Sequence, residues 1–295
     1  MKYGIYYAYW EHEWGGDYLK YVKKAGELGF DILEISCAGL ADKPGAEIRE
    51  LAAVAKDSGV FLTGGYGPKQ DENISSPDPG IVKNAFSFWM RTFDVLASLG
   101  INLVGGGLYS YWPVNFEKPF NKEEDRKRSI EGMKKLAEMA EGYGITLGME
   151  ALNRFEGYLL NTAAEALAYV KAVGRNNVKV MLDTFHMNIE EDDIIDAIKT
   201  AGAFLGHFHI GEANRRPPRP GTRMDWNAMG STLREINYSG PVVMEPFVLP
   251  GGQVGKDIKV WRDIAANGDL DEDARKSVAY IRKTFDGKEP FSKLG

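Results

Sequence analysis

The chain has 295 residues, of which 44% are hydrophobic and 26% are charged, as in typical globular proteins. Its formal net charge of −6 argues against a nucleic-acid partner, because phosphate backbones are bound by basic surfaces. The single cysteine, Cys37, excludes an internal disulfide, and no apolar run is long enough for a membrane span. The first residues lead into a strand pattern without a secretory signal, so we expect a cytoplasmic protein without membrane contacts.

Short apolar runs alternate with longer amphipathic segments along the chain. The apolar runs are typical of strands buried on both faces of a parallel sheet. In chain order they are Tyr3–Tyr7, Ile32–Ser36, Val60–Gly64, Ile101–Gly105, Ile145–Glu150, Val178–Asp183, Phe204–His209 and Val242–Glu245. The amphipathic segments predict helices over Tyr18–Leu28, Ala46–Ser58, Val82–Leu99, Lys122–Tyr143, Ala163–Val173, Asp192–Ala201, Trp226–Ile236 and roughly Asp271–Phe285. A glycine marks the expected end of five helices, at positions 29, 59, 100, 144 and 174.

Eight strand–helix pairs predict an α/β fold of the (β/α)8 or TIM-barrel type, with residues 1–295 forming a single domain. An open doubly wound sheet is the main competing fold. The phosphate-binding fingerprints that often accompany that fold are missing, since the glycines at 105–107 belong to no GxGxxG or Walker pattern. We expect the Pro- and Arg-rich segment 215–223 to be a long loop within the barrel.

The last four predicted strands each end in a side chain that can bind a metal ion. These residues are Glu150, Asp183, His209 and Glu245, on strands five to eight. Active sites of barrels form at the carboxyl ends of the strands, where neighbouring strands lie about 4.8 Å apart. Three carboxylates would repel one another there, and a divalent cation removes this repulsion. Oxygen and imidazole donors suit Mn²⁺, Co²⁺ or Mg²⁺ better than a structural zinc ion, which would favour cysteine.

The other polar residues near these strand ends are less specific. His207 points to the same side of its strand as His209, and we expect it to be a hydrogen-bonded barrel residue or a partner of the ligands. Glu156, His186 and Arg215 follow the strands that carry ligands and should lie near the metal, although each could equally stabilise its loop. Spacing alone does not decide between Arg215 and Arg216. Aromatic residues that could pack against a sugar or simply fill the core are Tyr6, Tyr7, Trp10, Trp14, Tyr109, Tyr111, Trp112 and Phe247.

Several motifs resemble the D-psicose (D-allulose)/D-tagatose 3-epimerases, a family of the xylose-isomerase-like TIM-barrel superfamily. The resemblance extends from Met1 to about Arg282, and the block at 176–192 is highly specific to these ketose epimerases. The segments that carry it are GIYYAYWEHEW at 4–14, YSYWP at 109–113, LNRFEGYLLNTAAE at 152–165, NNVKVMLDTFHMNIEED at 176–192, GHFHIGEANRR at 206–216 and VVMEPF at 242–247.

The resemblance implies a Mn²⁺ or Co²⁺ ion held by Glu150, Asp183, His209 and Glu245, with Glu150 and Glu245 also acting as the catalytic acid and base. It implies homodimers or homotetramers, the usual states in the family. It further implies that Glu156, His186 and Arg215 bind the first carbons of the sugar. Other positions that match the substrate pocket are Tyr6, Trp14, Gly65, Trp112 and Phe247.

Three departures from the family pattern bear on sugar preference. The loop at 215–223 is about one residue longer than usual, so that the fourth ligand falls at Glu245. Ile210 replaces the threonine that usually follows the ligand histidine. Gly107, another expected pocket residue, stands where many relatives have alanine.

The expected reaction is epimerisation of a ketohexose at C3, with D-fructose and D-psicose as the first candidates and D-tagatose and D-sorbose as further ones. A metal chelated by the C2 carbonyl and C3 hydroxyl oxygens would stabilise a cis-enediolate. Two glutamates on opposite faces of the sugar would exchange the proton. Which glutamate acts on which epimer is left open.

Three alternatives use the same type of barrel. An aldose–ketose or hydroxypyruvate isomerase would move hydrogen between C1 and C2 with a similar metal. A metal-dependent AP endonuclease would need three zinc ions and many histidines, whereas this acidic chain has four. A non-catalytic sugar-binding barrel would have no need for both Glu150 and Glu245.

Overall fold

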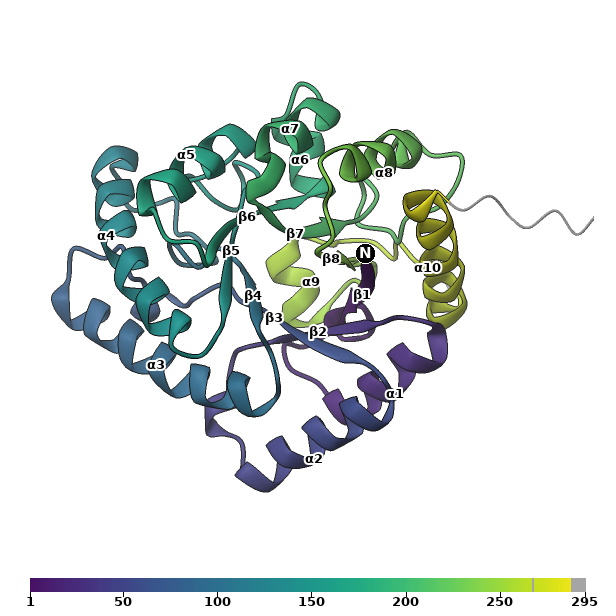
Figure 1. Cartoon of the computed structure of the whole chain (residues 1–295), viewed down its shortest axis with the longest axis horizontal. Coiled ribbons are helices and arrows are strands. Elements are labelled where there is room, and N and C mark those ends of the chain that lie inside the picture. Colours follow the sequence, from purple (N-terminus) through teal and green to yellow (C-terminus); the bar gives the residue numbers. More distant parts are fainter. Residues whose placement is uncertain (267, 288–295) are drawn as a thin grey trace, which may run out of the picture.

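The computed structural model describes residues 1–266 and 268–287. Eight parallel strands form a closed barrel in the order β1 to β8, with helices around it (Figure 1). The predicted TIM barrel is therefore confirmed, and the open doubly wound sheet is excluded. The predicted domain extends to residue 295 and so includes residues outside the described part of the chain.

The strands are short, as expected for a barrel that is buried on both faces. They are β1 (Lys2–Tyr6), β2 (Ile32–Ser36), β3 (Phe61–Gly65), β4 (Leu103–Gly106), β5 (Thr146–Glu150), β6 (Val178–Asp183), β7 (Leu205–Ile210) and β8 (Pro241–Met244). The predicted bounds differ by up to two residues. The consequential differences are that His209 is the penultimate residue of β7 and that Glu245 directly follows β8.

All eight predicted helices are present in the described part of the chain, and two short helices were not predicted. The helices are α1 (Tyr18–Leu28), α2 (Gly45–Asp57), α3 (Pro79–Ser98), α4 (Lys122–Glu141), α5 (Ala163–Val173), α6 (Thr184–Glu190), α7 (Ile194–Ala201), α8 (Trp226–Glu235), α9 (Gly252–Ile258) and α10 (Leu270–Asp286). The unpredicted α6 and α9 follow β6 and β8. Short 3-10 helices are η1 (Tyr7–Trp10), η2 (Leu40–Asp42), η3 (Gln70–Glu72) and η4 (Gly202–Phe204).

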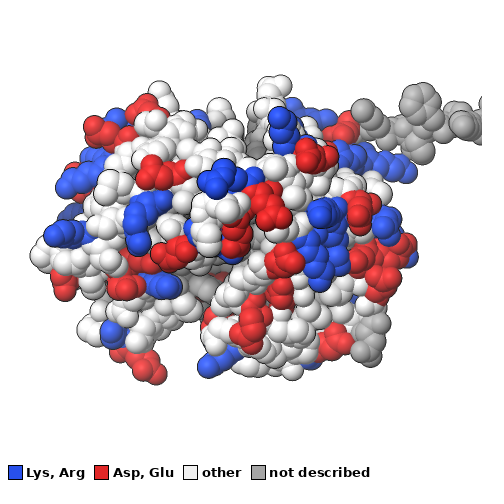
Figure 2. All heavy atoms as spheres, turned by 90° about the horizontal axis from the view of Figure 1, so that it is seen from below, with Lys and Arg blue, Asp and Glu red and all other residues white. Residues whose placement is uncertain are grey.

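The helix ends follow from simple backbone chemistry. The five glycines predicted to end helices all have positive φ, a conformation that costs glycine little. Side chains of aspartate, asparagine or threonine cap the N-termini of most helices, and Asp183 caps α6 by accepting a hydrogen bond from the Phe185 amide at 2.6 Å. None of the described helices is long and apolar enough to span a membrane. Acidic and basic side chains are interspersed on the face shown in Figure 2.

The barrel interior fixes the register at the site. The pairing of β6 with β7 shifts by one residue between Val180 and Met181, and this irregularity brings Asp183 opposite His209. Gly105 of β4 allows close packing there, because a Cβ atom would lie 2.9 Å from His207 Cδ2 and would also collide with the sulfur of Met181. The same arrangement leaves the imidazoles of His207 and His209 packed edge to face, with ring centroids 4.7 Å apart.

Candidate active site

Four side chains converge at the carboxyl ends of β5 to β8. Glu150 ends β5, Asp183 ends β6, His209 lies near the end of β7, and Glu245 follows β8. One ligand atom from each of the four lies within 4.8 Å of the others. Glu150, Asp183 and His209 are buried, whereas Glu245 is partly accessible. The strand ends therefore bring together the four residues that the sequence predicts to meet.

The donor atoms of this cluster fit a divalent cation. Oε1 of Glu150 and Nδ1 of His209 are buried without a hydrogen-bond partner among the described residues. Nδ1 of His209 lies 3.7 Å from Glu245 Oε1 and 3.9 Å from Asp183 Oδ2. Burial and the nearby carboxylate of Glu245 raise the pKa of Glu150 well above its usual range. A bound cation would remove the repulsion among the carboxylates and give the unpartnered atoms a ligand role.

Arg215 lies at the edge of the carboxylate cluster. Its Nη1 atom donates to Glu245 Oε2 at 3.0 Å and lies 3.4 Å from Asp183 Oδ2, while Nη2 lies 3.4 Å from Glu156 Oε1. Burial alone would lower the pKa of Arg215, but the three carboxylates raise it, so the guanidinium stays charged. It also stacks over the Phe185 ring, 3.8 Å from the ring centroid.

The structure distinguishes Arg215 from its neighbour, which spacing alone does not. Arg215 has a positive φ of 64°, and this backbone conformation turns its side chain into the site. The Arg216 guanidinium instead donates to the carbonyl oxygen of Ile264. The segment 215–223 contains no helix or strand, as predicted.

His186 of α6 presents one nitrogen to the site. Its Nδ1 atom accepts hydrogen bonds from the backbone amide of Asn153 at 3.2 Å and from the Asn153 side chain at 2.8 Å. Burial lowers the pKa of His186 to about 3, so the ring is neutral. A neutral ring that accepts at Nδ1 carries its proton on Nε2, which lies 3.7 Å from Glu150 Oε1. His186 can therefore donate a hydrogen bond to a ligand beside Glu150.

A cavity of about 330 Å³ opens above the carboxylate cluster, a size within the usual range for small-molecule sites. Every residue expected in the substrate pocket lines it, as do three of the four residues of the ligand cluster, all except Asp183. The lining includes Tyr6, Trp14, Gly65, Gly107, Trp112, Glu150, Glu156, His186, His209, Arg215, Glu245 and Phe247. The four aromatic rings among them form an apolar wall, and Trp14 packs edge-on against both Trp112 and Phe247.

The other aromatic residues considered in the sequence analysis do not line the cavity. Trp10 stacks on Tyr21 with ring centroids 5.2 Å apart and donates to Asp271. Tyr109 donates to the carbonyl oxygen of Glu150 at 2.8 Å, so it supports the strand that carries a cluster residue. Tyr7 and Tyr111 do not line the cavity.

Two of the departures from the family pattern have a local explanation. A Cβ atom on Gly107 would meet only Leu152 Cδ1, at an ordinary contact distance of 3.5 Å, so alanine would also fit there. Ile210 is fully buried, is not among the residues that line the cavity, and follows His209 on the strand, so its side chain points away from the barrel interior. Its influence on a ligand is therefore indirect.

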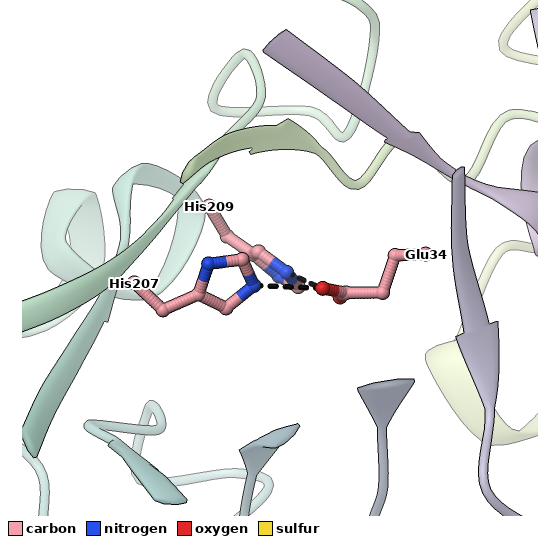
Figure 3. Close-up of side chains that lie close together, drawn as sticks. All are labelled: Glu34, His207 and His209. Carbon is pink, nitrogen blue, oxygen red and sulfur yellow. Dashed lines mark hydrogen bonds and ion pairs between the residues drawn. The ribbon is translucent and has the colours of Figure 1, made fainter. Parts of the chain in front are cut away.

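Sequence reasoning missed several residues at the site, among them Glu34, Tyr66 and Asp257. Glu34 of β2 hydrogen-bonds both His207 and His209 (Figure 3). Tyr66 lines the cavity, as does Asp257 of α9, which accepts from the Trp14 indole at 2.7 Å. The signal for Glu34 was present in the sequence, because a carboxylate within the apolar run ILEIS needs a buried partner. His207 is a hydrogen-bonded barrel residue, as expected.

Comparison with known proteins agrees with this geometry. Residues 22–284 match the family model of the xylose isomerase-like TIM barrel. The chain is 50% identical over 290 residues to a D-psicose 3-epimerase of Agrobacterium fabrum, covering 97% of this chain and 100% of that protein. The chain belongs to the D-psicose 3-epimerase family of xylose isomerase-like TIM barrels.

Further members of this family support the assignment. A D-psicose 3-epimerase of Ruminiclostridium cellulolyticum is 51% identical over 285 residues, covering 96% of this chain and 97% of that protein. The crystal structure of a D-psicose 3-epimerase in the presence of D-fructose superimposes with a TM-score of 0.95 at 50% identity, covering 97% of this chain and 99% of that one. The family expected from the sequence motifs is thus confirmed, as is the enzyme class, an isomerase acting on sugars.

Proposed function

We propose that the protein is a ketose 3-epimerase that uses one divalent metal ion, Mn²⁺ or Co²⁺, to interconvert D-fructose and D-psicose. The observation that carries the proposal is the convergence of Glu150 and Glu245 on one metal-binding cluster at the base of the cavity. They follow β5 and β8, which are not neighbours in the barrel, so their carboxylates approach the cavity from different sides. This arrangement suits proton removal from one face of a sugar and return to the other.

Each group has a distinct task in this proposal. The metal, when bound, supplies a Lewis acid for the carbonyl and hydroxyl oxygens at C2 and C3. Glu150 and Glu245 hold or move the C3 proton. His186 donates a hydrogen bond through Nε2, and Arg215 binds sugar oxygens while Glu156 orients its guanidinium. The aromatic wall formed by Tyr6, Trp14, Trp112 and Phe247 packs against the C–H groups and excludes water.

The deciding experiment is a ketohexose panel with metal-stripped protein that is reloaded with Mn²⁺ or Co²⁺. D-Fructose, D-psicose, D-tagatose and D-sorbose are incubated in deuterated water, and the products are separated and examined by NMR. We expect D-fructose to give D-psicose with deuterium at C3. Formation of aldoses with exchange at C1 or C2 would instead indicate an aldose–ketose isomerase, and no exchange at all would indicate a binding protein.

His186→Asn should lower kcat/KM roughly 10–100-fold, because the shorter side chain does not place a donor where Nε2 now lies. The metal ligands remain in place, so the bound Mn²⁺ per chain should stay unchanged. The matched control is His12→Asn, since His12 is an exposed histidine whose imidazole hydrogen-bonds the Pro250 carbonyl, away from the cavity lining. Loss of the metal from His186→Asn would contradict a role in sugar binding.

Asp257→Ala should raise KM roughly tenfold with little change in kcat. The carboxylate accepts the indole N–H of Trp14 at 2.7 Å, and hydrogen bonds to charged groups contribute about 1.5–3 kcal/mol. Without it, Trp14 loses the partner that holds it at the cavity wall. Gln253→Ala is the control, because Gln253 contacts the other oxygen of Asp257 at 2.7 Å and leaves Trp14 in place. An equal rise in KM for both variants would mean that loss of the Trp14 hydrogen bond is not the cause.

A further inference from the structure

Glu34 is a fully buried carboxylate at the centre of the barrel, and the proposed reaction gives it no task. It lies in the middle of β2 with apolar neighbours on both sides. Its Oε1 atom is 2.6 Å from Nε2 of His209, and Oε2 is 2.7 Å from Nε2 of His207 (Figure 3). Oε2 also accepts a hydrogen bond from the Thr63 hydroxyl at 2.8 Å.

This geometry defines the tautomer of both histidines. An ionised carboxylate only accepts hydrogen bonds, so each histidine must donate through Nε2. A neutral His209 ring that carries its proton on Nε2 has a free electron pair on Nδ1. That atom is the one that lies 3.7 Å from Glu245 Oε1 and 3.9 Å from Asp183 Oδ2, facing the ligand cluster.

We propose that Glu34 is a positioning residue for the metal centre, which holds His209 with Nδ1 directed at the ion. Histidine ligands commonly donate their other ring N–H to a carboxylate, which orients the ring and makes it a better ligand. His207 and Thr63 both bind Oε2, so they fix the plane of the carboxylate while Oε1 is left for His209. The inference rests on the proposed metal-dependent function.

A second metal ion between Glu34, His207 and His209 is a poorer account of the same three residues. The O···N separations of 2.6 and 2.7 Å are those of direct hydrogen bonds. An ion would instead lie about 2.0–2.2 Å from each donor and would need His209 to bind a metal through both nitrogens. The proton on each Nε2 explains the contacts with no additional ligand.

The test is the Mn²⁺ affinity of Glu34→Gln, measured by isothermal titration calorimetry on metal-stripped protein. The Gln side chain offers one oxygen and one NH₂ group, so it cannot accept from both histidines at once. We expect a Kd roughly 10–100-fold higher than in the unmodified protein. The control is Glu72→Gln, another buried carboxylate, which accepts from the Tyr66 hydroxyl and the Lys69 amide and should leave the Kd unchanged.

Thermal unfolding of the metal-free variants separates positioning from a merely structural role. Glu34→Gln should melt close to the unmodified protein, because a neutral amide replaces a buried charge. A lower melting temperature with an unchanged Mn²⁺ Kd would overturn the proposal.

A second measurement uses the unmodified protein, so it does not depend on whether a variant folds. NMR of ¹⁵N-histidine in the metal-free protein should find a proton on Nε2 of His209, and an Nε2 atom that carries no proton would overturn the proposal. Failure of this inference is distinguishable from failure of the proposed function. Unmodified protein that binds Mn²⁺ without epimerising sugars would reject the function, whereas an active enzyme with equal Kd for Glu34→Gln would reject only this inference.

Discussion

Glu150→Gln and Glu245→Gln should each lower kcat for epimerisation by roughly 10²–10⁴-fold and abolish C3 proton exchange of the one epimer from which the lost glutamate abstracts. Glutamine is nearly isosteric with glutamate and can still offer an oxygen to a cation, but it neither accepts nor releases a proton at neutral pH. Epimerisation needs removal on one face and return on the other, so losing either group stops the full reaction. The measurement is incorporation of deuterium at C3 of D-fructose and D-psicose, followed by NMR.

Because both glutamates also belong to the metal-binding cluster, the assay must be run with saturating Mn²⁺ and with bound metal measured in each variant. Glu212→Gln is the matched control. Glu212 is buried near the same strand ends but accepts hydrogen bonds from the Trp226 indole at 3.1 Å and the Arg219 amide at 3.0 Å. It should keep its activity. Near-normal epimerisation by a metal-loaded Glu150→Gln or Glu245→Gln protein would exclude the two-base scheme.

Asp183→Asn should remove most of the stabilisation that metal binding gives. A ligand present at about 100 times its Kd stabilises a protein by about 2.7 kcal/mol, which corresponds to a rise in Tm of roughly 5–10 °C. We expect this rise when Mn²⁺ is added to the unmodified protein and little rise in the variant. Asparagine can still cap α6 through its side-chain oxygen, so the substitution should not change the stability of this helix.

Asp193→Asn is the control for this prediction. Asp193 caps α7 by accepting from the Ile195 and Asp196 amides, as Asp183 caps α6, but it is not in the metal-binding cluster. The metal-free Asp183→Asn protein should be at least as stable as the unmodified one, because a carboxylate has left a crowded cluster. A full Tm increase with Mn²⁺ in the Asp183→Asn protein would mean that Asp183 does not bind the ion.

The sequence predicted the parts of the site that follow from strand ends. Glu150, Asp183, His209 and Glu245 close four successive apolar runs, and in a barrel such ends must meet. The fold was predictable for the same reason, because eight buried runs alternate with amphipathic helices. Short helices such as α6 and α9 were missed because seven residues carry too little periodicity to be recognised.

The remaining details depend on the conformation of single residues. Arg215 and Arg216 are adjacent and chemically identical, and only the positive φ of Arg215 turns one of them into the site. Glu34 comes from a strand far from the ligands in sequence, so its contact with β7 depends on how the closed barrel directs side chains across its interior. Asp257 contacts Trp14 because it lies on α9, a helix that the local sequence pattern did not predict.

The closed barrel also separates two groups of site residues along the chain. The metal-binding and proton-carrying side chains all follow β5 to β8, whereas much of the cavity wall comes from β1 to β4 and their loops, including Tyr6, Trp14, Gly65, Gly107 and Trp112. The strands of the two half-barrels pair at two seams, β4 with β5 and β8 with β1, and Glu34 of β2 also reaches His207 and His209 of β7 across the interior. Mutations in the first half that spare Glu34 can therefore reshape the sugar-facing wall while the second half retains the chemistry. Such a division makes the first 120 residues the natural region for diversifying substrate preference, in evolution or by exchange of segments between relatives.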